Sequence, residues 1–259
     1  MKKTFYQAAA WGLAHLVFPR AKVKSDTPLD FNEPAVYVCN HSGAIGPALM
    51  TLYFKVPHKT WMINYVLNKE KNANFIFHDF FFGRSKKHKK FWRFLAKFVA
   101  VLLRPLLWLS DPIHVFHDKR MVNTFRDTLS AFEEGKSVVI FAECPTPFSE
   151  YVNGLYSGFA DLGRSYLAAT GKNLKFYPVY AEQKNRAIRI GEPIEYYDDG
   201  KRTPPSVRRE EISEYIRDNI DKLARELPAN KPIPFLPKAW YDYYGEYQSN
   251  PMEYWKTFD

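Results

Sequence analysis

A histidine stands at the end of a short strand-like run near the start of the chain. Residues 36–38 are β-branched and aromatic, as in a buried strand, and His41 follows them. A histidine in this place has two properties of a general base, a pKa near neutral pH and an open path to a substrate hydroxyl. The small residues Ser42 and Gly43 would let a ligand approach the backbone beside it. The alternative is a histidine that only caps a strand or a helix.

Three later segments carry residues of complementary chemistry. FAECP at 141–145 contains the acidic residue Glu143, and IHVFHDKR at 113–120 ends in two basic residues. KFYPVYA at 175–181 carries a proline–valine pair on a strand-like run, and IRIGEPI follows it. Together with NHSGAIGP at 40–47, the order of these motifs resembles that of the lysophospholipid acyltransferase superfamily, the glycerol-phosphate acyltransferases. The resemblance spans about residues 35–195.

The resemblance implies a chemistry and a set of site residues. His41 would remove the proton of an acceptor hydroxyl, Lys119 or Arg120 would bind the acceptor phosphate, and Glu143 would lie near that phosphate. Backbone N–H groups around Ser42 and Gly43 could stabilise the oxyanion. We therefore expect His41 and Glu143 to be catalytic and to lie within about 12 Å of each other. We also expect either Lys119 or Arg120 to converge with them on a single groove at one edge of the sheet. The expected substrate-binding residues are Asn40, Ser42, Gly43, Gly46, Asp118, Lys119, Arg120 and Cys144.

Gly46 departs from the family pattern, which places an aspartate five residues after the histidine. Loss of such an orienting carboxylate costs about 10⁴ in rate in a serine protease. Either another acid, Glu143 or Asp118, reaches His41 through the fold, or an acceptor that needs less activation is used, or catalysis has been lost. If the orienting acid is merely missing, Gly46→Asp should raise activity.

We expect no disulfide framework, no metal site and no bound cofactor in this chain. Two cysteines are too few for a disulfide framework and favour a reducing, cytosolic setting. Cys144 could form a nucleophilic dyad with His41, although a small buried side chain is the commoner role of such a cysteine. His114 and His117 cannot share one face of a strand, so we expect no metal there. Without a phosphate-cradling glycine loop we expect no bound cofactor, and acyl-CoA or acyl carrier protein would be a co-substrate.

The positive charge of the chain is concentrated in two segments. The net charge is +9, yet residues 1–24 carry five Lys or Arg and residues 84–104 carry eight, with no acid in either segment. The remaining chain is therefore mildly acidic. This distribution favours a membrane surface as the partner and disfavours nucleic acid.

The segment from Phe91 to Leu109 is long enough to span a bilayer but too charged to do so. Nineteen helical residues rise about 28 Å, against a hydrocarbon core of about 30 Å. Charges at 93, 97 and 104 would each cost about 2.5 to 3.5 kcal/mol at the membrane centre. We expect an interfacial helix, kinked at Pro105, and the alternative is a core helix with a solvated charged stripe. The expected membrane-binding residues are Lys86, Lys87, Lys89, Lys90, Arg93, Phe94, Lys97, Phe98 and Leu102.

Short apolar runs alternate with helical patterns along the chain. We expect strands near 35–40, 60–66, 112–117, 137–142, 174–181 and 186–190, and helices over 121–133 and after Pro205. This alternation predicts a single-domain α/β fold, a mixed and mostly parallel sheet with helices on both faces. We divide the chain into an N-terminal amphipathic anchor (1–24), the α/β domain (25–228) and an aromatic wrap over that domain (229–259).

Two functions are compatible with these features. The first is an acyltransferase that moves a fatty acyl group from a thioester carrier to a hydroxyl of a lysophospholipid or related lipid alcohol, of the 1-acylglycerol-3-phosphate acyltransferase type. It would act in phospholipid biosynthesis at the cytoplasmic face of a membrane, as a peripheral or monotopic protein. The alternative is a catalytically silent lipid-binding protein on the same fold.

Overall fold

The strand that precedes His41 lies in the middle of the sheet. In the computed structural model, β2 (Ala35–Cys39) is buried at each of its five residues. The structure describes residues 5–18, 20–43, 45–69, 71–77, 89–116, 118–144, 149–197 and 203–228. The strands found within these ranges form one sheet in the order β1-β7-β6-β2-β5-β3-β4, with β8 also paired to β6.

Most strand pairs in this sheet are parallel. The strands are β1 (Lys22–Ser25), β3 (His58–Ile63), β4 (Pro112–Val115), β5 (Ser137–Ile140), β6 (Lys175–Glu182), β7 (Ala187–Ile190) and β8 (Ile194–Glu195). β2 pairs in parallel with both β5 and β6, and β7 and β8 pair antiparallel with β6. The carboxyl ends of β2, β5, β3 and β4 therefore share one edge of the sheet.

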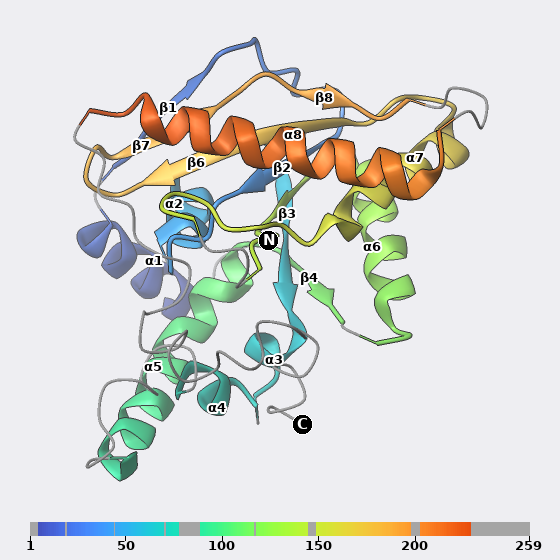
Figure 1. The fold of residues 1–259 in the computed structure, drawn as a ribbon. Coiled ribbons are helices and arrows are strands. Elements are labelled where there is room, and N and C mark those ends of the chain that lie inside the picture. Colours follow the sequence, from blue (N-terminus) through green and yellow to red (C-terminus); the bar gives the residue numbers. More distant parts are fainter. Residues whose placement is uncertain are drawn as a thin grey trace.

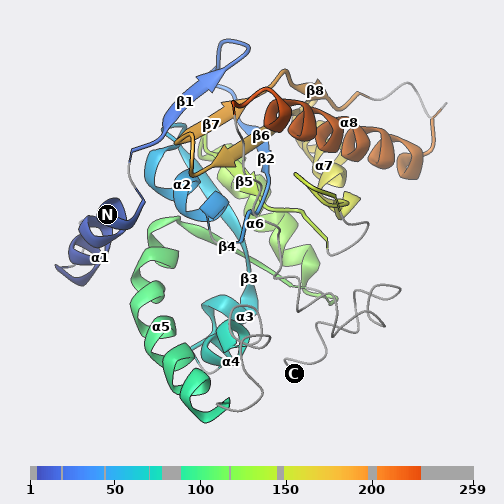
Figure 2. The same cartoon turned by 60° about the vertical axis from the view of Figure 1, so that its left-hand side comes forward.

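Helices cover both faces of the sheet, as Figures 1 and 2 show. Successive residues of a strand point to opposite faces, so Val36 packs in one core and Tyr37 in the other. The core of Val36 includes α6 (Met121–Glu133), α7 (Asp161–Thr170), the 3₁₀ turn η3 (Ser157–Ala160) and α8 (Pro205–Arg225). The core of Tyr37 includes α2 (Ile45–Tyr53), the helix that follows His41. The mixed α/β fold class is thereby confirmed.

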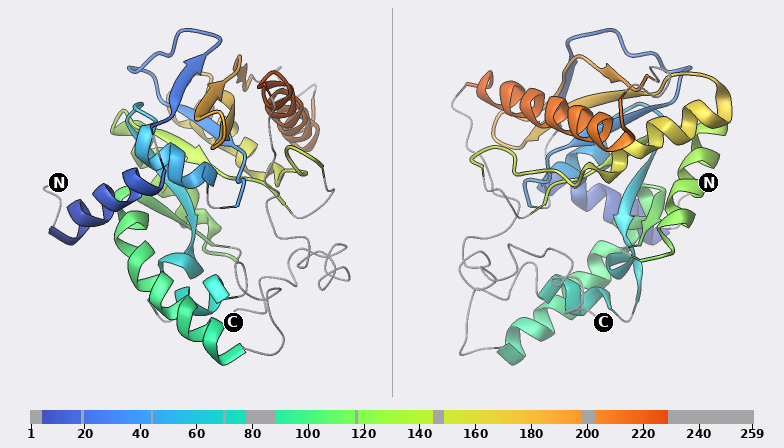
Figure 3. Two further views of the ribbon diagram at one scale, coloured as in Figure 1. Left: turned by 90° about the vertical axis from the view of Figure 1, so that its left-hand side faces the viewer. Right: turned by 45° about the vertical axis from the view of Figure 1, so that its right-hand side comes forward.

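The remaining helices contact one another, and they also contact α2, β3 and β4. They are α1 (Phe5–Val17), α3 (Asn64–Leu67), α4 (Asn72–Ile76) and α5 (Lys89–Leu109). Ala96 and Ala100 of α5 pack against Ile76 and Phe77, and α1 contacts both α5 and α2. Figures 1 to 3 show α1 and α5 on the same side of the molecule. α5 continues past Pro105 to Leu109.

The six expected strands and two expected helices are all present within a few residues of their expected bounds. Among the described elements, no range was predicted for α2, α3, α4, α7, η3, β1 and β8. β1 pairs with β7 at the sheet edge, so the expected boundary at residue 24 falls inside a strand. The expected aromatic wrap, 229–259, lies outside the described residues.

Candidate active site

His41 and Glu143 follow two neighbouring parallel strands. Val38 of β2 is in register with Ile140 of β5, so the residues after each strand emerge side by side. The backbone N–H of His41 donates a hydrogen bond to Glu143 Oε2. The expected proximity of these two residues is therefore confirmed.

The loop after β2 has an unusual backbone conformation that is held by Asn40. Ser42 and Gly43 both have left-handed φ values, 45° and 62°, and the first is uncommon for a residue with a Cβ. Asn40 Oδ1 accepts a 2.7 Å hydrogen bond from the N–H of Ala181 on β6, and Asn40 Nδ2 donates a 2.7 Å bond to Ser42 Oγ. The buried Asn40 side chain thus ties the loop to the neighbouring strand.

Glu143 is a buried carboxylate with three backbone donors. The N–H groups of His41 and Ser42 point to it, and the N–H of Asn153 donates a 3.0 Å bond to its Oε1. Burial raises the pKa of Glu143, and the three donors oppose that rise by stabilising the ionised form. The N–H of Ser42 is therefore engaged by Glu143, which corrects the expectation that it serves the oxyanion. Asn153 was missed because no motif marks a residue that acts through its backbone.

The imidazole of His41 is oriented by a backbone carbonyl. Nδ1 of the ring forms a hydrogen bond with the carbonyl oxygen of Gly43. A carbonyl oxygen only accepts, so Nδ1 carries the proton in the neutral ring and Nε2 carries the lone pair. Burial lowers the pKa of His41 to about 4, against the opposing effect of the Gly43 carbonyl. The ring is therefore neutral near pH 7, with Phe141 packed edge-on at 5.5 Å between ring centroids.

The residues expected to bind phosphate lie farther along the same edge. Asp118, Lys119 and Arg120 follow β4, and β5 and β3 lie between β4 and β2. Three strand spacings correspond to about 14 Å. Arg120 Nη2 contacts Asp118 at 2.6 Å, and its guanidinium stacks 4.5 Å from the ring centroid of Phe116. Asp118 is thus paired with a local cation and separated from His41 by these strands, which does not fit its suggested role as the substitute acid.

The two cysteines border the same loops but are buried. Cys39 Sγ lies 3.6 Å from Asn40 Oδ1, and burial raises the pKa of its thiol. The N–H of Cys144 donates a 2.9 Å bond to the carbonyl of Gly154. Burial of Cys144 fits a packing role better than that of a nucleophile. Within the described ranges, no group of three or more His, Cys, Asp or Glu side chains is placed to hold a metal.

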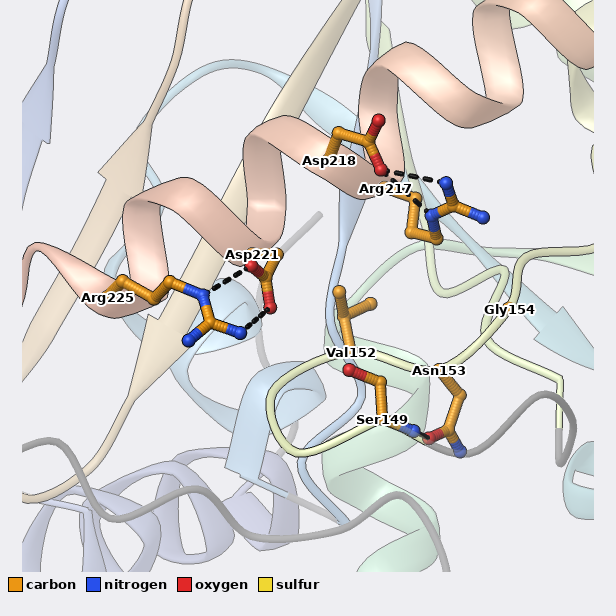
Figure 4. A pocket seen from close by; sticks show the side chains of 8 residues that line it. All are labelled: Ser149, Val152, Asn153, Gly154, Arg217, Asp218, Asp221 and Arg225. Carbon is orange, nitrogen blue, oxygen red and sulfur yellow. Dashed lines mark hydrogen bonds and ion pairs between the residues drawn. The ribbon is translucent and has the colours of Figure 1, made fainter.

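A separate cleft of about 390 Å³ lies between α8 and the segment 149–154 (Figure 4). Its charged residues are paired: Arg217 binds Asp218, and Arg225 binds Asp221. Asn153 lines the cleft and also donates to Glu143, whereas His41 is not part of its wall. The cleft is therefore next to the Glu143 segment and distinct from the histidine site.

Comparisons with known proteins give a likeness of fold to solved structures. No family model matches the chain, and no curated protein matches it. Among solved structures, the chain is similar to the 1-acyl-sn-glycerophosphate (LPA) acyltransferase PlsC from Thermotoga maritima, with 14% identity and a TM-score of 0.46. The match covers 86% of this chain and 81% of the other. A likeness of this size assigns no role to any residue of the site.

Gly46 is enclosed by the backbone of the loop that it follows. An added Cβ would lie 2.2 Å from the carbonyl oxygen of Asn40 and 2.9 Å from that of His41. The Gly46 N–H also donates a 3.1 Å bond to the His41 carbonyl in the first turn of α2. No side chain fits here without displacing the loop. The expectation that Gly46→Asp restores an orienting acid is therefore withdrawn.

Gly46→Ala should destabilise the protein by about 3 kcal/mol, because its methyl group overlaps backbone atoms that cannot rotate away. Urea unfolding of the variant and wild type would measure the change. Gly12→Ala in α1 is the matched control, since an added Cβ there meets no atom within 4 Å and should change stability by no more than about 1 kcal/mol. Equal stability of Gly46→Ala and wild type would contradict this account of the loop.

Proposed function

We propose that this protein is an acyltransferase that transfers a fatty acyl group from a thioester carrier to a lipid hydroxyl, with His41 as the general base. The observation that carries the proposal is the hydrogen bond from His41 Nδ1 to the Gly43 carbonyl. It places the lone pair of a neutral imidazole on Nε2, the form and the atom that a base needs. The histidine lies at the carboxyl end of a central parallel strand, where ligands of α/β sheets commonly bind.

The reaction can be written with His41 alone moving the proton. Nε2 accepts the proton of the acceptor hydroxyl as its oxygen attacks the thioester carbonyl carbon. The tetrahedral intermediate then collapses, the C–S bond breaks, and the imidazolium returns the proton to the leaving thiolate. The products are an ester and a free thiol, with no net change at His41.

The donor and acceptor are proposed at the level of chemical class. The donor is acyl-CoA or acyl carrier protein, and the acceptor is a lysophospholipid or related lipid alcohol, as in 1-acylglycerol-3-phosphate acylation. Lys119 or Arg120 is the proposed phosphate contact, since both residues follow β4 at the same sheet edge. No bound cofactor takes part in this scheme.

A catalytically silent lipid-binding protein is the second candidate. One observation favours it: the backbone N–H groups of His41 and Ser42 point to Glu143, so neither is directed toward a developing oxyanion. Turnover distinguishes the two functions, because both retain lipid but only the enzyme releases thiol.

His41→Ala should lower acyl transfer by about 10² to 10⁴-fold, the usual contribution of a general base. The assay follows thiol release from acyl-CoA with mixed lysophospholipid acceptors. His58→Gln is the control, because His58 begins β3 at the opposite edge of the sheet. Lipid retention with no turnover by wild type would contradict the enzyme and support the binding protein.

We also propose that the protein acts at the cytoplasmic face of a membrane, bound through α5. Among the described residues no helix has the length and apolar character to cross a bilayer. At 100° per residue, the exposed face of α5 has two flanks. Lys90, Arg93, Lys97 and the half-buried Arg104 form the basic flank. The apolar flank comprises Phe91, Phe94, Phe98, Val101 and Trp108.

The apolar flank is unusual for a solvated helix. Phe94 is 69% exposed and Phe98 is 56% exposed, although α5 already packs its alanine-rich side against α4. On α1, which contacts α5, Leu13 and Leu16 are also exposed. A basic flank beside an aromatic one fits an anionic lipid surface, which attracts the cations and accepts the rings. Lys86 and Lys87 lie outside the described residues, as do the side chains of Lys89 and Leu102.

Two sets of substitutions should weaken vesicle binding in different ways. Changing Lys90, Arg93 and Lys97 to Gln should reduce binding to phosphatidylglycerol vesicles by about a hundredfold at low salt, at about 1 kcal/mol per charge. Phe94→Ser with Phe98→Ser should reduce binding at every salt concentration, because it removes apolar insertion. Co-sedimentation measures both effects.

Val122→Ser is the control for the aromatic pair, since Val122 is 68% exposed on α6. It should bind as wild type does. Unchanged binding of the Phe94 and Phe98 variant, with its fold intact by circular dichroism, would contradict an interfacial α5.

A further inference from the structure

We propose that Glu143 is a positioning residue that holds the His41 loop through backbone N–H groups, and that the Gly43 carbonyl takes the place of the missing carboxylate at the imidazole. This inference rests on the proposed role of His41 as the base. The Glu143 carboxylate holds the loop after β2 in its conformation, and the Gly43 carbonyl of that loop orients the imidazole of His41.

Glu143 receives backbone hydrogen bonds from two loops of the site. A buried carboxylate is costly unless it is hydrogen-bonded, and Glu143 collects donors from two segments that are far apart in sequence. The N–H groups of His41 and Ser42 come from the loop after β2, and that of Asn153 comes from the segment after β5. Successive N–H groups beside left-handed residues form a concave anion site, and here the chain's own carboxylate fills it.

The imidazole of His41 is held by the backbone of its own loop. With Ser42 and Gly43 in left-handed conformations, the chain turns back so that the Gly43 carbonyl meets the imidazole of a residue only two positions earlier. Asn40 supports the same turn by bonding Ser42 Oγ and the β6 backbone. Release of either anchor would let the carbonyl move away from Nδ1, and the preference for one tautomer would be lost.

The close packing at Gly46 leaves no room for an orienting carboxylate at that position. Gly46 stands where the family pattern places an aspartate, and even a Cβ at Gly46 would overlap two backbone carbonyl oxygens. A carbonyl orients the ring as a carboxylate would, but it carries no full charge to stabilise the imidazolium. We therefore infer that the loop still orients the imidazole of His41. The imidazolium, however, receives less electrostatic stabilisation than a carboxylate would give it.

The test observes the ring directly and does not depend on turnover. Long-range ¹H–¹⁵N spectra of ¹⁵N-histidine-labelled protein report which ring nitrogen carries the proton. Wild type should show His41 as the Nδ1–H tautomer. An Nε2–H tautomer in wild type would overturn the role of the Gly43 carbonyl.

Glu143→Gln tests the role of the carboxylate. The variant keeps the shape of the side chain but turns an amide NH₂ toward backbone donors, so the His41 spectrum should change to a mixture of tautomers. The matched control is Glu150→Gln, an exposed glutamate seven residues away that should leave the spectrum unchanged. A His41 spectrum identical to wild type would overturn the proposal, as would a Glu143→Gln protein that cannot fold, because Glu143 would then be purely structural.

Turnover of the same samples separates this inference from the proposed function. If the tautomer responds as expected and wild type shows no acyl transfer, the positioning is correct and the enzyme assignment is wrong. If wild type is active, Glu143→Gln should lower kcat by about tenfold or more with little change in KM, because the loss concerns the base and not substrate binding. Glu143→Asp, which keeps the charge, should recover part of that loss.

Discussion

The carboxylate of Glu143 joins the two loops on which the candidate site depends. β2 and β5 are neighbours, but the pairing of two strands does not by itself fix the conformation of the loops after them. The buried carboxylate needs donors, and the backbone N–H groups of His41, Ser42 and Asn153 supply them. This carboxylate holds the loop that contains the left-handed turn and the contact of Gly43 with the imidazole. The same loop provides the backbone carbonyls that Gly46 approaches closely.

Much of the fold could be predicted because its signals are local. The β2 segment is a short apolar run of β-branched and aromatic residues, and α6 has apolar residues at helical spacing. The proline pair before α8 marks a helix start. α2 was missed because Gly46 and Pro47 resemble a loop, although proline is well tolerated in a first helical turn. β1 was missed because its exposed, lysine-containing sequence gains its strand identity only by pairing with β7.

The site was predictable only in part. The sequence was sufficient to predict that His41 and Glu143 lie close together, because their motifs follow two strands that were expected to be parallel. The atoms that meet were not predictable, because Glu143 binds the backbone of His41 while a backbone carbonyl contacts the ring. Gly46 illustrates the same limit: in sequence it is a missing acid, whereas in space it is a position where the loop leaves no room for a side chain.

The central claim is that His41 is a neutral, half-buried imidazole that is held by its own loop and acts as the proposed base. The pH dependence of kcat/KM tests this claim most directly. Burial lowers the pKa of His41 to about 4, so the unprotonated base persists in acid. The acyl-transfer rate should therefore stay constant from pH 8 to about pH 5 and fall to half near pH 4. A half-maximal rate near pH 6.5, the value of an ordinary solvated histidine, would contradict the account, as would an acid limb that persists in His41→Ala.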